Sequence, residues 1–258
     1  MKGWAKWAVV AGMSAFALAA AKVAPVVVGY IGGREAVRWL TNDGPPSVSE
    51  LESALSKQGF TFYAVIKAEL PEEYPALMSS VISTMEGEAD ETIAQQKGMA
   101  LLADLRRRHA RSLLAAPDDA LSAALYGQLD VLELVQRRET YQICNQVAAS
   151  GPAVLGATDR QYHLAFNGAA ISLFRAIGAG RRNAVKVEPA SDDDWAEVGT
   201  KFLEMGATEE QSQALQTNDM TSPNYCPATI LALKAVLDLR GPIGRRVRAD
   251  MAYNIAKG

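Results

Sequence analysis

Histidine and cysteine are both scarce in this chain, with two residues of each among 258. Zinc sites need several such ligands at short, paired spacings, and calcium loops need acidic residues at regular alternate positions; the sequence has neither pattern. It also lacks a glycine-rich phosphate loop after a strand and a serine in a nucleophile-elbow motif. We therefore predict no metal and no cofactor, and the sequence identifies no enzymatic reaction.

Charged residues are almost absent from one long stretch near the N-terminus. Trp7 to Ile31 is apolar apart from Lys22, and it follows Lys2 and Lys6. As a helix, these 25 residues would extend roughly 37 Å, which exceeds the roughly 30 Å hydrocarbon core of a bilayer. A lysine within the membrane is unfavourable unless its side chain reaches the interface. We interpret residues 1–40 as a retained membrane anchor, so membrane lipid is the first expected partner.

Two alternatives to an anchor remain open. Trp7–Ala21 has the length of a signal-peptide core, and Ala17–Ala19 and Ala19–Ala21 match the small-x-small pattern of a cleavage site, which would give a secreted protein. The apolar stretch Val23–Gly33 argues against cleavage, because it would lie at the new N-terminus. The other alternative is a buried core helix of a cytoplasmic protein.

Basic residues flank the apolar segment equally, with Lys2 and Lys6 before it and Arg34 and Arg38 after it. The positive-inside rule therefore gives no preference for either orientation. A short tail before a first apolar segment usually stays inside, so we expect the body of the protein outside the cytoplasm, in the periplasm.

The remainder of the chain is predicted to be one acidic, soluble domain. Residues 41–46, with the sequence Thr-Asn-Asp-Gly-Pro-Pro, form a turn-rich linker, and residues 47–258 are enough for a proper hydrophobic core. Residues 41–258 contain 21 lysines and arginines and 28 aspartates and glutamates, a net charge of −7. This balance argues against nucleic acid as a partner.

Helical patterns extend through most of the domain. Ser47 and Glu50 match a capping box, and Ser191 precedes three aspartates at another expected helix start. Apolar residues recur at intervals of three and four in several stretches, including about 89–115 and 121–132. Phe60–Ile66 is the best candidate for a strand, and we interpret it as helical or irregular.

A further helix is marked by apolar residues from Tyr162 to Ile177, and Gly178 and Gly180 indicate its end. Many amphipathic helices joined by short loops favour antiparallel packing. The predicted fold is all-α: an antiparallel helical array behind a single N-terminal hydrophobic helix.

The two cysteines are the most specific chemical feature. Cys144 lies late in a helical stretch, and Cys226 comes immediately before Pro227. An even number in an exported chain indicates one disulfide, which would close a loop of about 80 residues. A thiol nucleophile at Cys226 with His163 as its base is one alternative, and it requires a reducing compartment. Two inert buried thiols are the other.

Arginines are concentrated in two groups. A solvated face with acidic partners nearby is the simplest interpretation, and contact with anionic lipid head groups or an acidic partner is the functional one. The groups consist of Arg106, Arg107, Arg108 and Arg111, and of Arg245, Arg246 and Arg248.

Together these features favour a membrane-anchored interaction or scaffold protein of the cell envelope, with a protein partner besides lipid. The alternatives are a cell-envelope hydrolase that uses a carboxylate or Cys226, and a small-ligand carrier with a site between helices. A cleft with converging acidic residues would favour the hydrolase, and an exposed apolar patch on helix faces would favour the scaffold.

Overall fold

The structure is a computed structural model that describes residues 46–57, 59–87, 91–151, 160–186 and 188–258. These ranges contain helices and no strand, which confirms the all-α prediction. The predicted anchor, with Trp7, Lys22 and Ile31, lies outside the described residues, as does the predicted linker apart from Pro46. The elements are α4 (Val48–Lys57), α5 (Phe62–Glu69), α6 (Tyr74–Gly87), α7 (Glu91–His109), the 3-10 helix η2 (Ala110–Ala115), α8 (Asp118–Arg138), α9 (Tyr141–Ser150), α10 (Arg160–Arg182), α11 (Asp192–Glu204), α12 (Glu209–Gln216), α13 (Tyr225–Asp238) and α14 (Gly241–Lys257).

Local capping signals set two of the predicted helix starts. The backbone N–H of Ser47 donates to the Glu50 carboxylate at 2.8 Å, and the Glu50 N–H donates to Ser47 Oγ at 3.3 Å. Ser191 and Asp194 make the same reciprocal pair at the start of α11, at 2.8 and 3.2 Å. The predicted capping box at Ser47 and the predicted helix start at Ser191 are both confirmed, and each pair satisfies backbone donors that have no partner within the helix.

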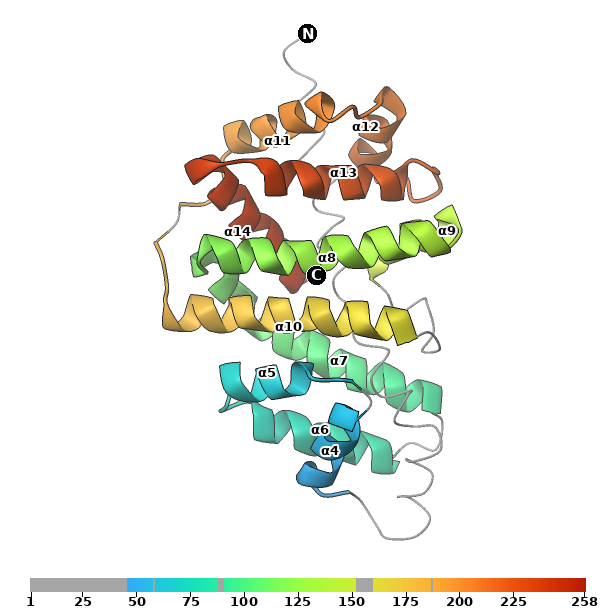
Figure 1. The fold of residues 1–258 in the computed structure, drawn as a ribbon, viewed down its shortest axis with the longest axis vertical. Coiled ribbons are helices and arrows are strands. Elements are labelled where there is room, and N and C mark those ends of the chain that lie inside the picture. The colour runs from blue at the N-terminus through green and yellow to red at the C-terminus, as the bar shows by residue number, and fades with distance from the viewer. Residues whose placement is uncertain (1–45, 58, 88–90, 152–159, 187) are drawn as a thin grey trace.

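The centre of the domain is a layer of antiparallel helices. Figure 1 shows α10, α8 and α13 stacked side by side, with α8 running opposite to both neighbours. Gly127 on α8 permits a close approach to α10, because a Cβ at this position would lie 2.9 Å from the Ala169 Cα and 2.6 Å from Ser172 Oγ. Buried Leu121, Leu125 and Val135 continue the apolar side of α8.

The end of α10 differs from the sequence prediction. Gly178 and Gly180 were expected to end the helix, but α10 continues through both glycines to Arg182. Their role is in packing. A Cβ at Gly180 would overlap the carbonyl oxygen of Ser112 on η2, and one at Gly178 would overlap the side chain of Glu69. The prediction was wrong because a glycine near a helix end resembles a C-cap in sequence, although here it serves close contact.

Most of the remaining helices lie beyond the two sides of this central layer. In Figure 1, α11 and α12 lie at one end of the molecule, beyond α13, and α4, α5, α6 and α7 lie at the other end. The C-terminal helix α14 packs against η2, α8, α7 and α11, so it connects parts of the array that are distant in sequence. None of the helices in the described ranges is long and apolar enough to cross a membrane.

Candidate functional site

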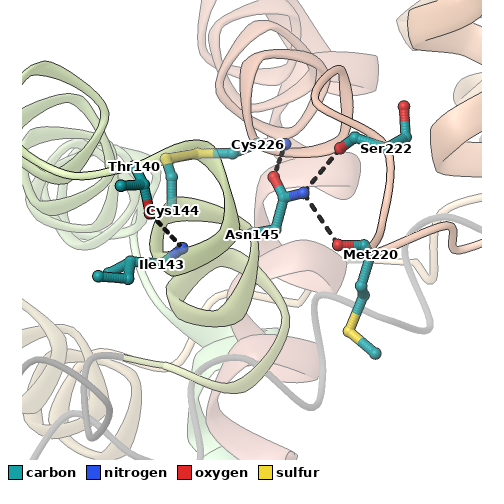
Figure 2. The surroundings of a disulfide bond; sticks show 7 residues. All are labelled: Thr140, Ile143, Cys144, Asn145, Met220, Ser222 and Cys226. Carbon is teal, nitrogen blue, oxygen red and sulfur yellow. Dashed lines mark hydrogen bonds between the residues drawn. A yellow bond between two sulfur atoms is a disulfide. The ribbon is translucent and has the colours of Figure 1, made fainter.

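The structure contains the predicted disulfide between Cys144 and Cys226. Cys144 lies on α9, Cys226 is the second residue of α13, and their Cα atoms are 5.7 Å apart across 82 positions of sequence (Figure 2). Thr140 starts α9 by accepting a hydrogen bond from the Ile143 N–H. The exposed fractions of Cys144 and Cys226 are 2% and 0%. With both sulfurs bonded, neither is a thiolate, so this form of the protein has no cysteine nucleophile.

Beside the disulfide, the fully buried side chain of Asn145 connects α9 to the segment that leads into α13. Its Nδ2 donates to the carbonyl oxygens of Met220 and Ser222, at 2.9 and 2.7 Å, and its Oδ1 accepts from the Cys226 N–H at 3.0 Å (Figure 2). All three partners are backbone groups. A covalent bond and a buried amide therefore hold the same junction, and sequence reasoning missed the amide.

The two histidines lie in different parts of the array. His109, at the end of α7, places Nε2 3.2 Å from the Glu73 carboxylate, and its side chain is 15% exposed. His163 on α10 is 5% exposed, and its ring centroid lies 5.5 Å from that of Phe60. Within the described residues, no group of three or more histidine, cysteine, aspartate or glutamate side chains is arranged to hold a metal ion.

The first arginine group has members in different surroundings. Arg107 pairs with Asp104 at 3.6 Å, and Arg108 lies 3.2 Å from Glu73 and 3.3 Å from Asp104. Arg111 is exposed on η2. Arg106 is only 4% exposed, and burial, followed by the charge of Arg107, lowers its pKa to about 9. Arg106 is therefore still a cation at neutral pH, although its side chain is almost entirely removed from water.

The second arginine group lies on α14, and two of its members bind carboxylates of this chain. Arg248, which is 4% exposed, contacts both oxygens of Asp118 at 2.8 Å and donates to the carbonyl oxygens of Val236 and Leu239. Arg246 holds Asp194 at 2.8 and 2.5 Å, and this hydrogen-bonded pair keeps the pKa of Asp194 far below its usual range. These two arginines join α14 to α8 and α11.

Burial acts in the opposite direction on a neighbouring carboxylate of α14. Asp250 accepts a hydrogen bond from the indole N–H of Trp195 at 3.2 Å, and its desolvation raises its pKa. The interface between α11 and α14 therefore contains one carboxylate whose ionised form is stabilised and one whose ionised form is disfavoured.

The comparisons with known proteins give no relative: no protein-family model, curated protein or solved structure matches this chain.

Proposed function

We propose that this chain is a membrane-anchored interaction or scaffold protein whose helical domain lies outside the cytoplasm, in the cell envelope. The observation that carries the proposal is the buried Cys144–Cys226 disulfide, which uses both cysteines of the chain. Disulfides of this kind form and persist in oxidising compartments and are rare in the reducing cytoplasm. The apolar sequence from Trp7 to Ile31 supplies the tether, and a periplasmic domain is its most direct interpretation.

A docking role is supported by apolar side chains that the fold leaves in water. Leu203 and Met205, at the end of α11, are 55% and 39% exposed, and Met220, in the segment after α12, is 47% exposed. Helices α11 and α12 lie together at one end of the molecule (Figure 1). Exposed apolar groups in one part of a domain favour contact with another protein.

Fractionation of cells that produce the full-length chain tests the location. We expect the chain with its intact N-terminus in the membrane pellet after a carbonate wash, and both cysteines resistant to alkylation without reductant. A soluble form that begins near Ala20 or Lys22 would show secretion after cleavage. Free alkylation of both cysteines in denatured, unreduced protein would refute an extracytoplasmic domain.

Cross-linking in intact cells tests the docking role. Replacing Leu203, Met205 and Met220 together with serine should remove the cross-linked complex and leave the melting temperature nearly unchanged, because these side chains are already exposed. Leu164→Ser is the matched control, since Leu164 is 54% exposed on α10. An equal loss of the complex in both variants, or no loss in either, would contradict the assignment.

A further inference from the structure

Two arginines of this structure bind a carboxylate with the same edge of the guanidinium group, the edge that carries Nε and Nη2. Arg246 uses Nε and Nη2 to hold Asp194, and Arg248 uses Nε and Nη2 to hold Asp118. The two N–H groups on this edge are coplanar and parallel, so they match two oxygens of a carboxylate or phosphate group. The fold thus shows twice that this edge takes a carboxylate as its partner, and Arg248 shows it for a buried arginine.

Arg106 has the same edge buried, and among the described residues it has no acceptor. Neither Nε nor Nη2 is accessible to water, and neither has a hydrogen-bond partner. The nearby carboxylates bind other groups: Asp104 pairs with Arg107 and Arg108, and Glu73 pairs with Arg108 and His109. Arg245 on α14 has the same unpartnered edge, but its residue is only partly buried. Arg106 is therefore the clearest case.

Small apolar residues lie one turn before and one turn after Arg106. Ala103, one turn before it, is 8% exposed, and Ala110, one turn after it, is 1% exposed. Helix α7 packs against α6, η2 and α14. A buried guanidinium is strongly unfavourable unless an anion compensates its charge. An aliphatic side chain at this position would avoid the cost of removing a charge from water.

We propose that Arg106 binds the oxyanion group of a small ligand, a phosphate or a carboxylate, through its Nε–H and Nη2–H. Free phosphate, an organic acid and the phosphate of a lipid head group share this chemistry. Because both nitrogens are covered, the ligand enters through a local opening around α7. Binding should therefore be saturable and specific for oxyanions, unlike the general effect of salt on surface charges.

Thermal unfolding of the detergent-solubilised full-length chain tests this proposal. The melting temperature is measured against inorganic phosphate, succinate or dihexanoyl phosphatidic acid, with chloride keeping the ionic strength constant. We expect at least one oxyanion to raise the melting temperature with saturation, as a ligand of the folded state does. A response to inorganic phosphate or to succinate indicates a soluble ligand of that kind, and a response to the phosphatidic acid alone indicates a lipid head group.

Three variants distinguish the effect of the planar Nε–Nη2 edge of Arg106 from the effect of its charge and from the effect of neighbouring arginines. Arg106→Lys keeps the charge but loses the planar edge, so binding should weaken at least roughly tenfold, which corresponds to one charge-assisted hydrogen bond. Arg106→Met should abolish the response and, in chloride buffer, should be as stable as the wild type or more so. The control Arg111→Met should keep wild-type affinity, because Arg111 is exposed on η2.

Three results would overturn the proposal. The first is the absence of a saturable response of the wild type to all three oxyanions. The second is an equal response in wild type and Arg106→Lys. The third is a destabilisation by Arg106→Met in chloride buffer as large as that by Arg248→Met, because it would mean that Arg106 already has its partner within the chain. Should Arg106→Met fail to fold, the first two criteria still decide the proposal.

Discussion

Replacing Cys144 and Cys226 together with alanine removes a cross-link between positions 82 residues apart. In the chain-entropy description, a loop of this length raises the free energy of unfolding by about 4.5 kcal/mol, because the cross-link restricts the unfolded chain. For a domain of this size, 1 kcal/mol corresponds to about 2–4 °C in melting temperature. We therefore expect the double variant to melt about 9–18 °C below the wild type, as followed by far-ultraviolet circular dichroism of the detergent-solubilised full-length chain.

The buried amide of Asn145 allows a test of how the disulfide stabilises the protein, in addition to the size of the stabilisation. Asn145→Ala leaves the carbonyls of Met220 and Ser222 and the N–H of Cys226 without their partner, which destabilises the folded state by about 1–3 kcal/mol for each group that water cannot reach. The disulfide acts mainly on the unfolded state and the amide on the folded state. If the disulfide acts only on the unfolded state, the two effects should add to within about 0.5 kcal/mol in a double-mutant cycle. This additivity would contrast with the coupling of roughly 0.5–3 kcal/mol that neighbours with a shared partner usually show, and Asn145 shares such a contact with Cys226.

Two outcomes would refute this reasoning. A double-alanine variant that melts within a few degrees of the wild type would show that the loop entropy is not realised in this chain. A strong coupling between the Asn145 and cysteine substitutions would show that the disulfide acts by positioning the start of α13. Reductant gives an independent check: both sulfurs are buried, so it should act slowly on the folded protein and rapidly after unfolding.

Two further predictions concern glycines and carboxylates. Gly180→Ala should destabilise the fold by about 1–3 kcal/mol, because its Cβ would overlap η2, whereas Gly168→Ala on the same helix meets no atom within 4 Å and should stabilise it by up to about 1 kcal/mol; equal effects in thermal unfolding would contradict the packing role. Burial raises the pKa of Asp250. The stabilising contribution of the protonated Asp250 is therefore complete below the unfolded pKa near about 3.9 and is lost as pH rises through the folded pKa. The variant Asp250→Asn should be as stable as the wild type at low pH and more stable at neutral pH. Arg246 lowers the pKa of Asp194, so Asp194→Asn should be less stable than the wild type at neutral pH and approach its stability only well below pH 3.9. Parallel pH profiles of stability for Asp194→Asn and Asp250→Asn would disprove these opposite pKa shifts.

Local interactions explain why much of the helical array could be predicted. The capping pairs Ser47–Glu50 and Ser191–Asp194 join residues three positions apart, so their chemistry is visible in a short stretch of sequence. Gly180 shows the limit of this approach. Its neighbour across the interface is Ser112, 68 positions earlier, and nothing near Gly180 in sequence distinguishes a helix end from a close contact.

The disulfide could be predicted, whereas the amide beside it could not. Two cysteines allow only one intramolecular pairing, so the expectation of a disulfide leaves no choice of partner. Asn145 has many potential acceptors, and its three partners belong to a segment more than 70 positions away. In sequence, Asn145 was simply a polar residue within a helix, and its burial became apparent only when α9 and α13 were brought together.

The burial of the arginines also depends on contacts between residues that are distant in sequence. Arg106 is the first residue of the first arginine group, and Arg248 is the last residue of the second. For both groups the sequence favoured a solvated face. In the structure they are equally buried, but Arg248 has Asp118 from a helix 130 positions away, and Arg106 has no acceptor among the described residues. The packing of the helices determines whether an arginine is buried, and it also determines whether a carboxylate lies close enough to compensate the buried charge. A buried cation without such a neighbour is therefore the point at which this fold most directly indicates a ligand of opposite charge.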